Sequence, residues 1–133
     1  MANKSKKKGT RAETSVVRFL ESYGFKARRK TLKGNKDEGD IELFDAPGLR
    51  SPITIEVKAG QQTANPNRAQ LEEWLRQARI EGENSGQQCV LCIVRYRRKL
   101  KDADVYLQYK NEYAPGEIIR EHMYLDEFCE TYL

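Results

Sequence analysis

Three charged residues, Asp40, Glu56 and Lys58, have the types and the spacing of a hydrolytic metal site. Asp40 begins the run Asp-Ile-Glu-Leu-Phe, and Glu56 and Lys58 stand two residues apart in Ile-Thr-Ile-Glu-Val-Lys. Side chains two apart on a β-strand share a face, so Glu56 and Lys58 would project side by side. Two carboxylates beside one ammonium group are what a hard divalent cation and an attacking water require.

The segments that carry these residues have the pattern of a β-hairpin. Residues 53–58 alternate between β-branched and polar side chains, which is typical of a half-buried strand. Residues 40–44 are expected to be the partner strand, because the residues between the two segments have turn chemistry. Pairing would bring Asp40 near Glu56 and Lys58. The alternative is that Glu56 and Lys58 form an ordinary exposed ion pair on an edge hairpin, which contributes little to stability.

A further acid, Glu13, lies near the start of the first expected helix. Thr10 and Glu13 have the spacing of a capping box, so the helix is expected to begin near Thr10. Its apolar stripe consists of Val16, Val17, Phe19, Leu20 and Tyr23. Gly24 would end it in the left-handed conformation. Glu13 could cap the helix, join the metal site or do both, and the local pattern favours the cap.

Positive charge is concentrated in the N-terminal quarter of this 133-residue chain. Residues 1–36 carry a balance of +10 and the remainder a balance of −6, which gives the net +4. We expect residues 1–8 to form a flexible basic arm and residues 9–133 to form one domain. A basic arm on an acidic body favours a nucleic-acid partner, because binding to phosphates releases counterions. A merely solubilising arm is the alternative.

The other apolar segments, which alternate or, at residues 89–94, form a continuous apolar run, predict a sheet with helices against it. The expected strands are residues 25–30, 40–44, 53–58, 89–94 and 104–109, with residues 118–124 left open between strand and coil. Asn65-Pro66 has the chemistry of a second helix start, and Gly82 or Gly86 would end that helix. Asp126 is expected to cap a short closing helix.

Cysteine usage and hydropathy indicate an intracellular protein. Three cysteines without disulfide-type spacing are typical of a reducing compartment, and no segment approaches the about eighteen apolar residues of a membrane span. Cys89 and Cys92 form a Cys-x-x-Cys pair, but residues three apart on a strand point to opposite faces. His122 is the single histidine, so four convergent zinc ligands are not available. We expect core thiols instead.

Three short motifs in this order resemble the PD-(D/E)xK nuclease superfamily, and within it the archaeal-type and phage Holliday junction resolvases. The motifs are Gly9-Thr10-x-x-Glu13, Gly39-Asp40-Ile41 and Ile55-Glu56-Val57-Lys58. The resemblance covers roughly residues 4–95. Gly39 rather than proline precedes Asp40, a departure that is frequent in the resolvase-like branch.

The resemblance implies an α/β, restriction-endonuclease-like fold with a central mixed β-sheet flanked by helices in the order α-β-β-β-α-β-β-α. It implies a Mg²⁺-dependent, structure-selective DNA endonuclease that resolves four-way junctions in recombination and repair, with Mn²⁺ able to substitute. Asp40, Glu56 and the Val57 carbonyl would hold the ion. Lys58 would activate the hydrolytic water. Glu13 would be catalytic too, binding through water or holding a second metal.

The resemblance also implies branched DNA as partner, a homodimer, and the cytoplasm of a bacterial, phage-infected or archaeal cell. The phosphate contacts would come from Lys6, Lys7, Lys8, Arg11, Arg28, Arg29, Lys30, Lys33 and Lys36. For Arg28 to Lys30 the alternative is an edge strand protected by charge. Gln77 and Glu81 lie at helical spacing and could reach the site as accessory residues, or could be solvated.

Two other functions remain open. One is a repair, restriction-type or RNA-directed nuclease of the same fold. The other is a non-catalytic nucleic-acid-binding module whose acids are surface residues. The chain has no phosphate-binding glycine motif and no Ser/His/Asp constellation that would favour a different chemistry.

Overall fold

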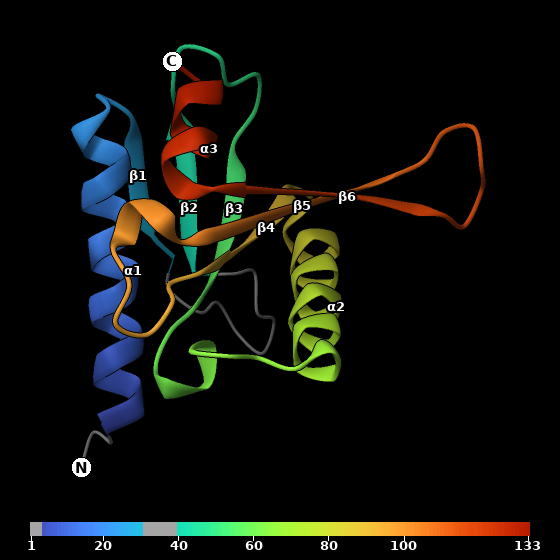
Figure 1. Cartoon of the computed structure of the whole chain (residues 1–133). Coiled ribbons are helices and arrows are strands. Elements are labelled where there is room, and N and C mark those ends of the chain that lie inside the picture. The colour runs from blue at the N-terminus through green and yellow to red at the C-terminus, as the bar shows by residue number, and fades with distance from the viewer. Residues whose placement is uncertain (1–3, 31–39) are drawn as a thin grey trace.

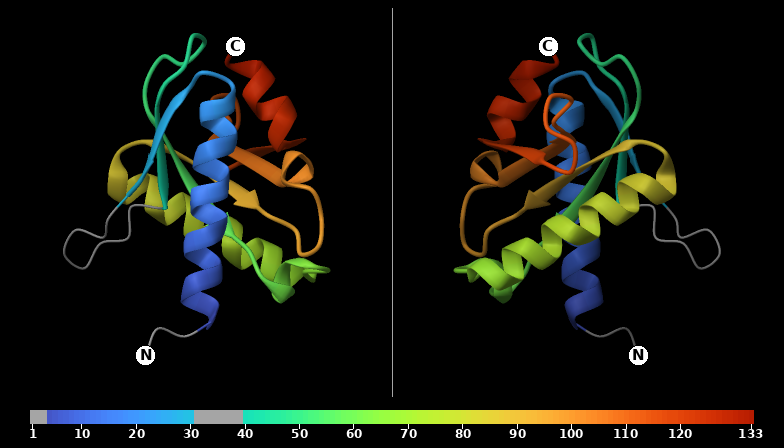
Figure 2. Two further views of the ribbon diagram at one scale, coloured as in Figure 1. Left: turned by 90° about the vertical axis from the view of Figure 1, so that its left-hand side faces the viewer. Right: turned by 90° about the vertical axis from the view of Figure 1, so that its right-hand side faces the viewer.

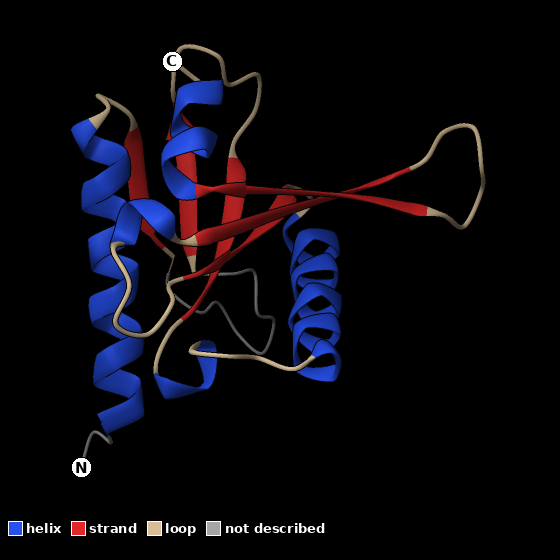
Figure 3. Ribbon diagram, viewed as in Figure 1, coloured by secondary structure: helices blue, strands red, loops and turns tan. Residues whose placement is uncertain are grey.

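A computed structural model describes residues 4–30 and 40–133 (Figure 1). The elements are α1 (Lys4–Ser22), β1 (Lys26–Arg29), β2 (Ile41–Asp45), β3 (Ile53–Lys58), α2 (Arg68–Ser85), β4 (Gln88–Ile93), β5 (Asp104–Lys110), β6 (Ile118–Tyr124) and α3 (Leu125–Thr131). Figure 3 shows how the strands gather between the helices. The expected α/β fold with a mixed sheet is confirmed.

The six strands lie side by side in chain order, from β1 at one edge to β6 at the other. Among the strands of the described residues, only β3 and β4 pair in parallel, with α2 as the crossover between them, and the other pairs are antiparallel. Residues 118–124, which the sequence left open, are a strand, because they pair along the whole length of β5. The β5–β6 hairpin extends beyond the body of the protein (Figure 1).

Helices cover both faces of the sheet and divide the core into two layers. Figure 2 views the molecule from the α1 side and from the α2 side. On one face, Val16 and Leu20 of α1 and Phe128 of α3 pack against the sheet. On the other face, Trp74 and Leu75 of α2 pack against β4. The alternating side chains of the central strands therefore meet apolar partners on both sides.

The helix starts differ from the expectation. α1 begins at Lys4, so the prediction that it begins near Thr10 with a capping box is wrong. Lysine is a good helix former, and residues 4–8 of the expected flexible arm extend the helix by more than a turn. Residues 1–3 lie outside the described part. The division into an arm and one nuclease domain stays a prediction.

The other two helices are also capped at different residues. Asn67, and not Asn65, caps α2, where its side chain accepts from the Gln70 amide at 2.8 Å. Gly86 ends this helix with φ of +70°, a conformation that favours glycine. The predicted cap at Asp126 is wrong, because α3 already begins at Leu125. Among the described residues, no helix has the length and apolar character needed to cross a membrane.

The cysteines are core thiols, as expected. All three are free and buried, with Cys89 in the α2 layer and Cys92 in the α1 layer. Burial raises the pKa of both Cys92 and Cys129 to about 12, which leaves almost no reactive thiolate.

We therefore expect the folded protein to react with Ellman's reagent at pH 8 at least roughly 100-fold more slowly than the protein in urea. The absorbance of the coloured thiolate that the reagent releases measures this reaction. Rapid release of one or more equivalents from the folded protein would contradict the burial of the thiols.

Candidate active site

The hairpin of β2 and β3 brings Asp40 to the main chain beside Glu56. The Asp40 amide donates to the Ile55 carbonyl at 3.1 Å, which continues the antiparallel ladder by one residue. The Val57 amide donates to Oδ2 of Asp40 at 2.7 Å. The Asp40 carboxylate is thus held over the end of β3, as the hairpin prediction required.

Glu56 and Lys58 lie side by side on the face of β3 that α2 covers. Nζ of Lys58 is 3.2 Å from Oε1 of Glu56. The prediction of a half-buried strand is wrong for the first four residues of β3, which are buried on both faces, and Glu56 is 5% exposed. β3 is the third of six strands, so its charged pair is not on an edge hairpin.

The environment of Glu56 opposes its negative charge. Burial raises the pKa of Glu56 to about 7, with the nearby Asp40 acting in the same direction. A hydrogen bond with Glu81 and the Lys58 ammonium lower the pKa but do not cancel the effect of burial. Oε2 of Glu56 is buried and has no hydrogen-bond partner among the residues described. A cation at this oxygen would compensate the buried negative charge of Glu56.

Glu13 joins the site from α1. Its carboxylate accepts from Nε of Arg29 at 3.0 Å, and its side chain is hydrogen-bonded with that of Asp40. Burial and the neighbouring Asp40 raise the pKa of Glu13, while Arg29 acts in the opposite direction. Two carboxyl groups from different elements therefore meet at the end of the sheet where β2 begins.

The residues present fit a hard divalent cation. Asp40, Glu56 and the Val57 carbonyl supply oxygen donors, which Mg²⁺ prefers, and Mg²⁺ usually keeps several waters as ligands. The buried Oε2 of Glu56 is the observation that favours a cation. Within residues 4–30 and 40–133, no three His, Cys, Asp or Glu side chains are grouped closely enough to hold a metal by themselves.

A cavity of about 360 Å³ opens beside Glu56, between β3 and α2. It is lined by Glu56, Lys58, Gln77, Ile80, Glu81 and Asn84. The structure thus brings the two accessory candidates, Gln77 and Glu81, to the acid and the lysine of β3. Glu81 is 5% exposed and is therefore not a solvated helix residue, whereas Gln77 is half-buried.

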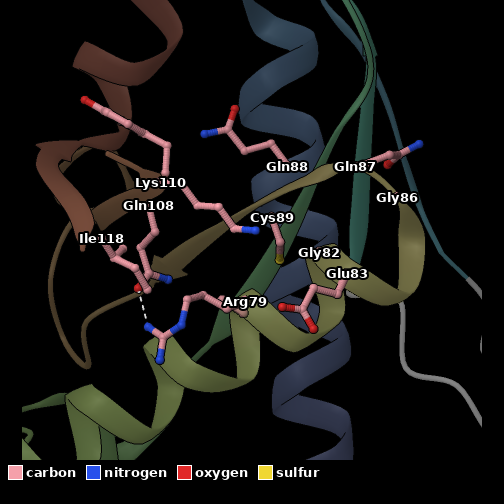
Figure 4. Close-up of a pocket in the computed structure, with 12 residues that line it drawn as sticks. Arg79, Gly82, Glu83, Gly86, Gln87, Gln88, Cys89, Gln108, Lys110 and Ile118 are labelled. Carbon is pink, nitrogen blue, oxygen red and sulfur yellow. Dashed lines mark hydrogen bonds between the residues drawn. The ribbon is translucent and has the colours of Figure 1, made fainter. Parts of the chain in front are cut away.

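A second cavity, of about 420 Å³, lies at the C-terminal end of α2 against β4 and the β5–β6 hairpin (Figure 4). Arg79 donates to Gln108 at its wall, at 2.7 Å. Its lining includes Glu83 and Lys110 but none of the site residues expected from the sequence.

The basic residues of β1 are paired with acids, and the adjoining Lys30 is paired with a hydroxyl. Arg28 donates to Glu42 at 2.6 and 3.1 Å and lies 4.9 Å from the ring centre of Phe44. Lys30 donates to Thr54 at 3.2 Å. β1 is an edge strand, as the alternative interpretation held, and the guanidinium of Arg28 remains largely exposed. These contacts would position the cations rather than hide them.

The structure gives only the location of the other basic residues that are expected to contact DNA. Arg11 is exposed on α1. Lys6, Lys7 and Lys8 lie in α1. Lys33 and Lys36 lie outside the described residues.

The comparisons place the fold among known structures. No family model and no curated protein matches the sequence. A structure of Hjc, a Holliday junction resolvase from the hyperthermophilic archaeon Archaeoglobus fulgidus, matches with a TM-score of 0.54. This chain shares the fold of that resolvase. The match covers 91% of this chain and 99% of the Hjc chain at 18% identity, so it extends beyond residues 4–95 into the C-terminal third.

Proposed function

We propose that this protein is a divalent-metal-dependent DNA endonuclease that resolves four-way junctions. The observation that carries the proposal is the meeting of Asp40, Glu56 and Lys58 at one end of β3, beside a cavity. The shared fold with a Holliday junction resolvase supports the choice of substrate. Membership of the PD-(D/E)xK superfamily is part of the proposal.

Each residue of the site has a distinct role in this proposal. Asp40, Glu56 and the Val57 carbonyl would hold Mg²⁺, which when bound lowers the pKa of a water and neutralises charge on the phosphate. Lys58, held against Glu56 at 3.2 Å, would orient the attacking water and donate to a phosphate oxygen. Glu13 would orient a water, since Arg29 fixes its carboxylate.

Binding of branched DNA would rest on phosphate contacts. Exposed cations beside the site, among them Arg11 and Arg28, would give affinity without sequence readout. Lys30, Lys33, Lys36 and the lysines at positions 6–8 would extend this surface. A homodimer would place two such sites on two strands of a symmetric junction. We propose a cytoplasmic location for this activity.

The test is cleavage of a labelled four-way junction and a matched linear duplex, with Mg²⁺, with Mn²⁺ and with EDTA. We expect paired symmetric nicks in the junction with either ion and no product with EDTA. A denaturing gel measures the products, and a native gel run with Ca²⁺ measures binding.

Other outcomes would choose among the alternatives. Equal cutting of junction and duplex would retain the nuclease and reject the resolvase. Faster cutting of a matched RNA would indicate an RNA-directed nuclease. Binding of all these substrates with no cutting in any metal would leave a non-catalytic binding module.

A further inference from the structure

A turn rich in basic residues follows β4, and the proposed function does not use it. We call it the basic turn, and its residues are Arg95, Tyr96, Arg97, Arg98 and Lys99. The last three are exposed. The turn leaves the sheet beside the proposed site, because the Val94 amide donates to the Lys58 carbonyl at 2.8 Å. In the view from the α1 side, β1 and the basic turn lie on opposite sides of α1 (Figure 2).

Hydrogen bonds fix the backbone of the basic turn. The Arg98 amide donates to the Arg95 carbonyl at 3.1 Å, and the Tyr96 amide donates to Oγ1 of the fully buried Thr63 at 2.9 Å. Arg97 has φ of +60°, and no other non-glycine residue of the described part takes a positive φ. Residues with side chains rarely adopt this conformation, and the exceptions cluster at functional sites.

Two aromatic rings are exposed next to the basic turn, on the strands that follow it. Arg95 pairs with Asp104, which is 3% exposed and whose Oδ1 lies 2.7 Å from Nε2 of His122. The His122 ring centre lies 4.8 Å from that of Tyr106 and 5.4 Å from that of Tyr124. The side chain of His122 is 40% exposed, and Tyr124 is 46% exposed. The turn and the rings therefore form one surface, which the pairing of Arg95 with Asp104 holds together.

This surface has the chemistry that binds a single-stranded nucleic acid. Cations attract phosphates, and exposed rings stack with bases, each of which has an aromatic face. The buried charge of Asp104 does not oppose this binding, because Arg95 compensates it. In a duplex the bases are stacked on one another, so their faces are not available to a protein ring. Exposed rings beside exposed cations therefore favour an unpaired strand over a duplex.

We propose that the basic turn and the rings of His122 and Tyr124 bind a single-stranded segment of nucleic acid. The phosphates contact the exposed cations at positions 97–99, and bases stack on the two rings. This site goes beyond the proposed function, because a fully paired four-way junction has no such segment. It adds affinity for nucleic acid in which one strand is unpaired.

The test is the binding of a labelled oligothymidylate of about 12 nucleotides to the full chain, measured by fluorescence anisotropy in EDTA. EDTA prevents metal-dependent cleavage, so the measurement does not depend on the proposed nuclease. Tyr124→Leu keeps an apolar side chain but removes the ring, and it should weaken binding at least about fivefold. Tyr124→Phe keeps the ring and should bind as wild type does. Tyr113→Leu is the matched control, because Tyr113 is 96% exposed outside this surface.

A second pair of variants tests the cations. Arg97→Gln combined with Arg98→Gln should weaken binding about tenfold and flatten its dependence on salt, because fewer counterions are released. Arg18→Gln combined with Arg50→Gln is the control, since it makes the same change in net charge at exposed positions of α1 and of the β2–β3 connection. This control should stay within about twofold of wild type. The unfolding temperature of each variant checks its folding.

Unchanged affinity in a folded Tyr124→Leu variant would overturn the inference, and so would equal losses in the two double arginine variants. The affinity for a matched duplex should not change in Tyr124→Leu, and an equal loss there would also contradict the stacking of bases. Tighter binding of a matched oligouridylate, with the same loss in Tyr124→Leu, would identify the strand as RNA. A protein that binds the single strand in this way and cuts no nucleic acid would support the inference and contradict the proposed function.

Discussion

Asp40→Asn is expected to abolish metal-dependent cleavage, with a fall in rate of roughly three orders of magnitude or more. The substitution keeps a side-chain oxygen that can accept the Val57 amide, which donates to Oδ2 of Asp40 at 2.7 Å. The end of β3 should therefore retain its conformation. What is lost is the negative charge that would hold the ion beside Glu56.

Single-turnover cleavage of a labelled junction measures this effect, and a gel-shift assay with Ca²⁺ measures binding. Junction affinity of Asp40→Asn should stay within about threefold of wild type, since the phosphate contacts are unchanged. Asp45→Asn is the control, because Asp45 ends β2, the strand that follows Asp40, and its side chain is 61% exposed and pairs only loosely with Lys26, at 3.7 Å. Cleavage by Asp40→Asn at the wild-type rate would reject Asp40 as a metal ligand.

Phe128→Ala is expected to lower the free energy of unfolding by about 3–5 kcal/mol. Phe128 is 1% exposed, stacks edge-on against Tyr132 at 5.1 Å and packs into the core layer that α1 covers. Truncation would leave a cavity between α3 and the sheet. A loss of this size would show that the closing helix is part of the cooperative core, although the sequence motifs end long before it.

Urea unfolding followed by the fluorescence of Trp74 measures this change, because Trp74 is the single tryptophan and lies in the other core layer. Tyr113→Ala is the control. Tyr113 is 96% exposed between β5 and β6, so its truncation should change the free energy by less than about 0.5 kcal/mol. A change below about 1 kcal/mol for Phe128→Ala would mean that α3 does not contribute to the cooperative core.

Local patterns predicted most of the elements, because each depends on neighbours in sequence. Period-2 alternation, the continuous apolar run at residues 89–94 and the turn residues before residue 53 together identified five strands, and Gly24 does take the left-handed conformation beyond α1. Helix starts were less reliable, since Thr10 has the residue type of a cap but lies inside a helix that the preceding lysines extend. The sixth strand was undecided because its side chains alternate little in burial and its order comes from pairing with β5.

Contacts between distant residues could not be predicted in this way. Glu42 was missed, although it is buried and accepts from Arg28 and from Gln87, which lies 45 residues further along the chain. Asp104 was also missed as a buried acid that pairs with Arg95 and with His122. A charged residue is buried only where the fold supplies its partner, so the residue type alone indicates exposure.

The sequence by itself determined which chemistry is available, because Asp40, Glu56 and Lys58 can be aligned on one hairpin from the two-residue repeat of a strand. The tertiary structure decided the burial, the pKa and the neighbours of these residues. The crossover from β3 to β4 places α2 over Glu56, which buries the acid, shifts its pKa and brings Glu81 to it. The effect of burial on a charge depends on what covers it, and only the packing of α2 on the sheet supplies that cover.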